Sequence, residues 1–260
     1  DAGVSLDIAT TKQPDAAQKR YEDLLKRKPD SVQALLGLAR VKSIRKAGKE
    51  EVASLLRKAV EVGPNEVLPR QLLVAHHLRN QEPKLALTAA QNAVAALPKS
   101  AELLDTLGQA QMAAKEFNQA VSTYGKMAAL QPQSTLPHLR MAGVYMANKD
   151  PAGAAQSLRK ALEIQPNLIV AQQGLAELAI RDKRVPDALS IVKDIQKQRP
   201  QEPVGFALEG EVHMASRNWP AAMVSYEQAL RLAPNATELA VKLHTAHLAG
   251  QKKREADAFA

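Results

Sequence analysis

Seven prolines recur through the chain at an almost constant interval. The first interval is 35 residues and each later one is 34 residues, for Pro29, Pro64, Pro98, Pro132, Pro166, Pro200 and Pro234. The residues around them repeat as well, as AVEVGPNE at 59–66, ALEIQPNL at 161–168 and ALRLAPNA at 229–236. A fixed period of this length is typical of repeat proteins, in which each unit is one supersecondary structure that stacks on its neighbours.

One period, residues 101–134, shows how each unit folds. An apolar stripe at helical spacing from Leu104 to Met112 predicts a first helix, helix A, over 101–114. After a short polar turn, a second stripe from Phe117 to Ala128 predicts helix B, which ends where the next proline cannot continue a helix. Each period is therefore predicted to be a helical hairpin.

Small side chains recur where two helices must approach most closely. One series, spaced by 34 residues, is Ala86, Ala120, Ala154, Ala188 and Ala222. A second series of equivalent, mostly small residues is Ala59, Ala93, Met127, Ala161, Ile195 and Ala229. A side chain no larger than a methyl group lets two helix backbones pack closely, so we expect these positions to lie at helix–helix contacts.

This pattern resembles the tetratricopeptide repeat (TPR) family. The small residue that this family has in helix A is matched by Gly108, Ala142, Ala176 and Gly210, and its aromatic residue in helix B by Tyr124 and Tyr226. The chain departs from the family where Glu209 replaces an expected leucine, and it lacks most of the aromatic residues of the first helix. The resemblance implies an all-α fold, a right-handed α-solenoid (superhelix) of antiparallel helix hairpins in which helices A line a concave groove.

The period divides the chain into six full repeats with a partial repeat at each end. The full repeats within 32–236 are 32–66, 67–100, 101–134, 135–168, 169–202 and 203–236. Residues 1–31 are predicted to hold the end of a helix A, marked by Val4 and Ile8, and a helix B. Residues 237–260 are predicted to hold a helix A and a truncated helix B. Because solenoids usually end in a polar capping helix, we expect this chain to be part of a longer array.

Composition and motifs exclude several classes of chemistry. The chain has no cysteine, which excludes disulfides and thiolate sites. Its apolar runs are far shorter than the roughly 20 residues that span a bilayer. It has no phosphate-binding glycine loop, nucleophile elbow or H-E-x-x-H motif. His244 and His247 could share a metal, but no third ligand is near in sequence. We therefore expect no enzyme activity, no cofactor and no metal site.

A partner is expected at the groove-facing positions of helices A. Leu78, Met112, Met146, Ile180 and Met214 are equivalent, and they form either inter-helix core or a compliant apolar strip for a peptide or helix, a role that suits methionine. TPR modules of the chaperone-adaptor type grip a terminal carboxylate with Lys and Asn in helix A, which this chain lacks at those positions. The candidate partner-binding residues are Gln71, Leu78, Gln109, Met112, Leu139, Met146, Gln173, Ile180, Glu211 and Met214.

Positive charge lies mostly on helices B and the turns, and the net charge is +8. Examples are the basic runs at 26–28, 57–58, 159–160 and 252–254. These residues form either a solvated face or a site for an acidic polysaccharide or anionic lipid head groups. Aromatic residues make up only 3% of the chain, which offers little for base stacking and argues against a nucleic acid partner.

The last third resembles a more specific family. LEGEVHMASRNWPAAMVSYEQAL and ELAVKLHTAHLAGQKKREAD are similar to the C-terminal repeats of bacterial TPR lipoproteins that accompany the PEP-CTERM/exosortase sorting system. The resemblance implies an exported protein of the bacterial periplasm or cell envelope, linked to exopolysaccharide production and protein sorting. Membrane association would then come only from a lipid anchor outside these 260 residues.

Three functions remain open at this point. The first is a non-catalytic scaffold that holds a peptide or helix of a partner protein in the groove. The second is a polysaccharide-binding or export-assisting module that uses the basic surface. The third is a cytoplasmic TPR co-chaperone.

Overall fold

The computed structural model describes residues 14–258, with side chains described as far as residue 251, and this part of the chain consists of helices and turns without a strand. The chain divides into two compact units, with the boundary between residues 132 and 133. The first unit contains α2 (Pro14–Arg27), α3 (Val32–Ile44), α4 (Lys49–Val62), α5 (Val67–Arg79), α6 (Pro83–Ala96), α7 (Ala101–Ala113) and α8 (Phe117–Leu130). The second contains α9 (Leu136–Ala147), α10 (Pro151–Ile164), α11 (Ile169–Arg181), α12 (Val185–Gln198), α13 (Val204–Ala215), α14 (Trp219–Leu232) and α15 (Thr237–Ala258).

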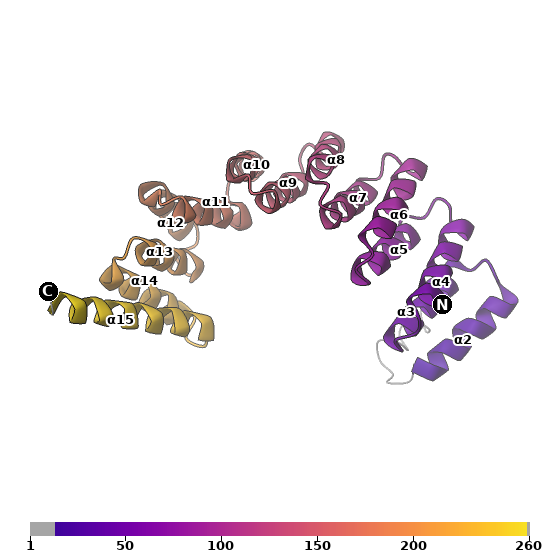
Figure 1. Cartoon of the computed structure of the whole chain (residues 1–260), viewed down its shortest axis with the longest axis horizontal. Coiled ribbons are helices and arrows are strands. Elements are labelled where there is room, and N and C mark those ends of the chain that lie inside the picture. Colours follow the sequence, from indigo (N-terminus) through magenta and orange to yellow (C-terminus); the bar gives the residue numbers. More distant parts are fainter. Residues whose placement is uncertain (1–13, 259–260) are drawn as a thin grey trace. The chain divides into compact units, whose positions relative to one another are not determined.

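Within each unit the helices form antiparallel hairpins that stack in sequence order (Figure 1). Helices A of successive repeats also touch, as α5 does with α7 and α11 with α13. All seven periodic prolines lie two residues beyond the end of a helix, because proline cannot continue it. The predicted fold class, an all-α TPR-type solenoid of helical hairpins, is confirmed.

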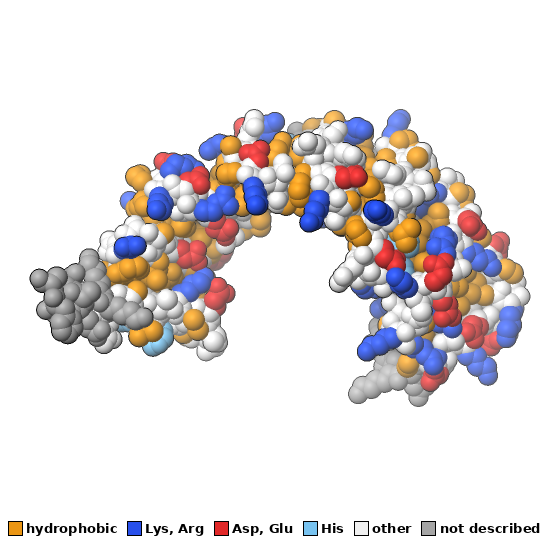
Figure 2. Space-filling model, viewed as in Figure 1, with side chains coloured by type: hydrophobic (Ala, Val, Ile, Leu, Met, Phe, Trp, Pro, Cys, Tyr) orange, Lys and Arg blue, Asp and Glu red, His pale blue; other side chains and the backbone are white. Residues whose placement is uncertain are grey.

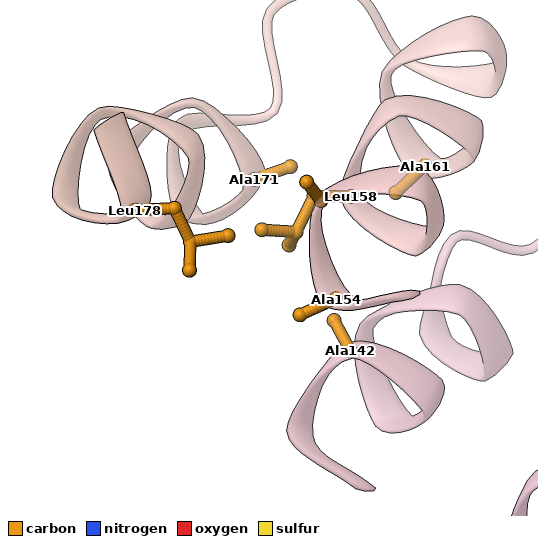
Figure 3. Close-up of a cluster of buried hydrophobic side chains, with 7 residues drawn as sticks. Ala142, Ala154, Leu158, Ala161, Ala171 and Leu178 are labelled. Carbon is orange, nitrogen blue, oxygen red and sulfur yellow. The ribbon is translucent and has the colours of Figure 1, made fainter. Parts of the chain in front are cut away.

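Both small-residue series lie at the helix contacts for which they were predicted. The alanines equivalent to Ala154 are all 0% exposed, and the series that contains Ala161 is at most 2% exposed. Figure 3 shows the geometry in one repeat, where Ala142 on α9 and Ala154 on α10 point toward each other. Any larger side chain would push these backbones apart, so the alanines set the distance between helices.

A second buried pair in each hairpin joins helix A to helix B sixteen or seventeen residues later. In each pair a larger side chain on one helix packs against a smaller one on the other. The pairs are Ala39 with Leu56, Val74 with Ala90, Gly108 with Tyr124, Ala142 with Leu158, Ala176 with Val192 and Gly210 with Tyr226. The two glycines are needed, because a Cβ on Gly108 would lie 2.3 Å from the Tyr124 ring and one on Gly210 would lie 2.4 Å from the Tyr226 ring. The pair therefore fills a nearly constant volume.

Glu209, which stands where the family has leucine, is accommodated by polar neighbours. Its carboxylate accepts hydrogen bonds from Gln196 Nε2 and from the Ser225 hydroxyl, both at 3.1 Å. Because both bonds reach Oε2, this oxygen of the half-buried carboxylate keeps hydrogen-bond partners, which lowers the cost of burial.

The sequence predicted a partial repeat at each end of the chain, 1–31 and 237–260. The predicted end of a helix A, with Val4 and Ile8, lies outside the described residues. The predicted break in 237–260 is wrong, since α15 is one continuous helix. Residues 251–256, QKKREA, are all strong helix formers, and the segment lacks the proline that opens helix B in α6, α10, α12 and α14. Nothing in this sequence therefore stops the helix at the expected turn.

We predict that Gly108→Ala destabilises the protein by about 1–3 kcal/mol, because the added methyl overlaps the Tyr124 ring. Gly108→Ala combined with Tyr124→Leu recreates the Ala142–Leu158 pair, so it should be more stable than the two single changes predict, by about 1 kcal/mol or more. Urea unfolding followed by circular dichroism measures this coupling.

Gly125→Ala is the matched control on the same hairpin. A Cβ there meets nothing within 4 Å, so this change should stabilise helix α8 by about 0.5–1 kcal/mol. Purely additive effects of Gly108→Ala and Tyr124→Leu would contradict the size balance.

Candidate functional site

The second unit has a pocket of about 480 Å³ formed by three consecutive helices. We call it the α9–α11 pocket. Its residues are Leu139, Ala142, Gly143, Met146, Leu158, Val170, Gln173, Gly174, Glu177, Leu178 and Arg181. Helices A of two successive repeats, α9 and α11, supply all of them except Leu158, which comes from helix B of the first repeat.

The floor of the pocket is the hydrophobic core of this unit. Ala142, Leu158 and Leu178 are buried members of one cluster, and Leu158 on α10 points toward α11 (Figure 3). Gly174 allows this arrangement, because a Cβ there would lie 2.9 Å from Leu158 Cδ1. The floor is therefore fixed by close packing, which suits a preformed site.

The walls are apolar and accessible. Met146 is 40% exposed and Val170 is 57% exposed, although both are large apolar side chains. Gly143, also in the wall, adds no side chain that would fill the space. Apolar side chains that stay open around a concave surface are a common feature of ligand-binding sites.

The polar residues of the pocket lie along α11. Gln173, Glu177 and Arg181 follow each other at intervals of four residues, so they share one helix face. They supply one amide and one charge of each sign, which leaves the rim neutral overall. The arrangement can orient a bound segment by hydrogen bonds without selecting for its charge.

The structure brings together three of the ten residues that the sequence predicted. Leu139, Met146 and Gln173 all line the α9–α11 pocket. Sequence reasoning missed Val170, Glu177 and Arg181 as lining residues. Val170 carried a usable signal, since it is a large apolar residue outside the buried stripe of its helix.

The other seven predicted residues have other surroundings. Leu78, Ile180 and Met214 are partly buried and pack against core clusters. Of the two roles considered for these positions, their surroundings favour inter-helix core over an apolar strip for a partner. Gln71 bonds Thr106 Oγ1 at 3.4 Å, Gln109 donates to Asp105 at 2.7 Å, Glu211 pairs with Lys242 at 2.8 Å, and Met112 is half-buried.

A buried histidine pair lies at the junction of α4, α5 and α6. His76 Nε2 donates to the Lys49 carbonyl at 2.8 Å, and His77 Nδ1 donates to Glu82 Oε2 at 2.9 Å. Lys49 also pairs with the Glu82 carboxylate. Bonds from Lys49 and His77 hold the pKa of Glu82 below its usual value, whereas burial lowers the pKa of His76. The neutral form of His76 is therefore the one that this junction stabilises.

The described part of the chain shows no group of three or more His, Cys, Asp or Glu that could hold a metal ion. The two histidines singled out in the sequence, His244 and His247, are both exposed on α15. Among the described helices, none has a stretch that is long and apolar enough to cross a membrane.

A stack of helical hairpins with an apolar pocket on helices A defines the class of helical-repeat binding proteins. Tetratricopeptide repeat models match residues 11–66 and 145–211. The chain therefore carries tetratricopeptide repeats in these two segments, and proteins with such repeats are generally non-catalytic scaffolds for protein–protein interaction. No curated protein matches the chain.

Solved structures share the fold at low sequence identity. The C-terminal part of a TPR repeat-containing protein from Cytophaga hutchinsonii has a TM-score of 0.66 and 14% identity, over 93% of this chain and 98% of that one. PilF from Pseudomonas aeruginosa has a TM-score of 0.56 and 19% identity, over 85% and 98%. YrrB, described as a TPR protein with an unusual peptide-binding site, has a TM-score of 0.50 and 18% identity, over 74% and 98%.

We predict that acid destabilises the protein through His76. Because burial lowers its pKa in the folded state, the unfolded chain binds the proton more readily, and stability falls as the pH drops below about 6.5. Burial also lowers the pKa of His138, which acts in the same direction.

In urea unfolding at pH 7 and pH 5, His76→Gln should show a smaller loss of stability than the unmodified protein. The matched control is His247→Gln, at an exposed position, which should keep the full loss. An equal loss with His76→Gln would show that His76 does not carry the effect.

Proposed function

We propose that this chain is a non-catalytic scaffold that holds an apolar peptide or helical segment of a partner protein in the α9–α11 pocket. The observation that carries the proposal is the exposure of Met146 and Val170 above a floor of buried core residues. Burying these two side chains under a partner removes apolar surface from water, which is the main driving force of such contacts.

The shape and chemistry of the pocket favour a peptide segment. The pocket lies between two successive helices A, and its apolar wall residues come from both of them. A segment placed there meets apolar side chains on two sides, as in helix-in-groove recognition. Methionine is flexible, so Met146 can adjust to different apolar partners. The fold shared with YrrB, which is described as having a peptide-binding site, supports a peptide ligand.

The charge distribution gives less support to an acidic polysaccharide. On the face shown in Figure 2, acidic and basic side chains are interspersed over α2–α6. Several basic residues of helices B and the turns are engaged locally: Arg57 pairs with Glu50, and Arg199 donates to the Asn167 carbonyl at 2.8 Å. A long polyanion would have to compete with these contacts.

A peptide-display selection on the purified chain tests this proposal. Selected peptides should contain an apolar core of two or three residues, and Met146→Glu should weaken their binding at least about tenfold, because a carboxylate would be desolvated in an apolar pocket. Fluorescence anisotropy measures the affinity, and circular dichroism checks that the variant stays folded.

Val224→Glu is the matched control, since Val224 is 66% exposed and lies on α14 outside the pocket. It should leave peptide binding unchanged. Peptides that bind Met146→Glu as well as the unmodified chain, or a selection that yields none, would contradict the proposal.

We also propose that the scaffold works in the bacterial envelope, in a protein-sorting or exopolysaccharide system. The support is the similarity of LEGEVHMASRNWPAAMVSYEQAL and ELAVKLHTAHLAGQKKREAD to TPR lipoproteins of the PEP-CTERM/exosortase system. In that setting the anchor would be a lipid attached outside residues 1–260.

Fractionation of cells that produce the full-length protein checks the location. We expect an antibody against this chain to detect it in the envelope fraction. Detection in the cytoplasmic fraction alone would contradict the envelope proposal and favour a cytoplasmic role.

A further inference from the structure

The first unit has a larger open hollow, of about 900 Å³, formed by α2, α3, α4 and α5. We call it the α2–α5 hollow. None of the ten candidate residues from the sequence lines it. Ile44, Leu68 and Leu72 do, and they are 56%, 54% and 38% exposed. Three large apolar side chains exposed around one concavity are unusual for a protein surface without a partner.

Two arginines accompany this apolar surface. Arg40 on α3 and Arg79 on α5 both line the hollow and are exposed, and none of the described residues that line it is Asp or Glu. Among the residues that the structure describes, neither arginine has an ion-pair partner. Within this part of the chain, no acidic side chain therefore competes with an added anion for either guanidinium group.

The α9–α11 pocket provides an internal comparison. Arg79 and Arg181 are 102 residues apart, three periods of 34, so they occupy the same position in their repeats. At the position of Glu177, however, α5 has Ala75 and α3 has Arg40. The two sites thus share their place on helices A. Among the described residues, however, the α9–α11 pocket has one charge of each sign, whereas the α2–α5 hollow has two arginines and no acidic residue.

We propose that the α2–α5 hollow binds an acidic amphipathic segment of a partner protein, with apolar side chains on one face and Glu or Asp beside them. The apolar side chains of this segment cover Ile44, Leu68 and Leu72. Its carboxylates bind Arg40 and Arg79, since the guanidinium group donates paired hydrogen bonds to a carboxylate. This site shares no residue with the α9–α11 pocket, so the proposal does not depend on the function proposed for that pocket.

Three labelled helical peptides of about 20 residues serve as probes. The first has leucines at i, i+3, i+4 and i+7 with glutamates on either side of this stripe, the second replaces the glutamates by lysines, and the third replaces the leucines by alanines. By fluorescence anisotropy with the full chain, the first should bind at least about tenfold more tightly than either of the others. Added salt should weaken this binding, because the contacts of the glutamates with Arg40 and Arg79 are ionic.

Substitutions in the chain then locate the contact. Arg40→Glu with Arg79→Glu should weaken binding of the acidic peptide about tenfold or more and improve binding of the lysine peptide. Leu72→Asp should weaken binding of both. The matched control is Arg27→Glu with Lys58→Glu, the same charge change at exposed positions on α2 and α4 outside the hollow, which should leave the preference for the acidic peptide intact. Circular dichroism confirms that each variant is folded.

Three results would overturn the proposal. The first is equal binding of the acidic and lysine peptides, or binding of neither. The second is an equal loss of binding in the control variant, which would show a general charge effect. The third is a dimer of this chain, detected by analytical ultracentrifugation, that Arg40→Glu with Arg79→Glu dissociates, which would show that a second copy fills the hollow.

Discussion

Close approach of helix backbones at small side chains is the constraint on which the rest of this structure depends. The alanines equivalent to Ala154 are fully buried in every repeat that has one. The second contact in each hairpin conserves volume by pairing a small residue with a large one, as Gly108 does with Tyr124 and Ala142 with Leu158. Because interiors are packed as densely as crystals, these contacts hold the two helices of a hairpin at a fixed separation, and successive repeats can stack with the same geometry.

That geometry leaves one face of helices A without a covering helix. The side chains there are free to differ between repeats, since they do not take part in the packing. The α9–α11 pocket and the α2–α5 hollow use equivalent positions with different residues, Glu177 in one and Arg40 in the other. A chain of nearly identical structural units can in this way carry two binding sites of different charge, which we propose is how this scaffold distinguishes two partner segments.

The sequence was sufficient to predict the hairpins, the buried alanines and the helix ends, because each depends on contacts that recur in every repeat. It was less informative about the site, because exposure there depends on neighbouring helices. Met146 and Met214 are equivalent in the repeat, yet Met146 is 40% exposed, while Met214 packs on a cluster against which Leu243 of the next helix also lies. The α2–α5 hollow was missed because Leu68 and Leu72 lie outside the helix A positions that were compared. The continuous α15 was missed because the period alone predicted a turn that its residues do not form.

Rigid packing between helices presents an apolar, preformed surface on helices A of the second unit, and we propose that a partner segment binds there. Methyl NMR of the labelled chain, titrated with a peptide selected for binding, tests it most directly. We expect chemical-shift changes at the methyl groups of Leu139, Met146, Val170 and Leu178. The methyl groups of Ala154 and Ala161, which are fully buried in the core of this unit, should keep their chemical shifts. Shifts confined to helices B, or large shifts of those buried alanine methyls, would contradict a preformed surface on helices A.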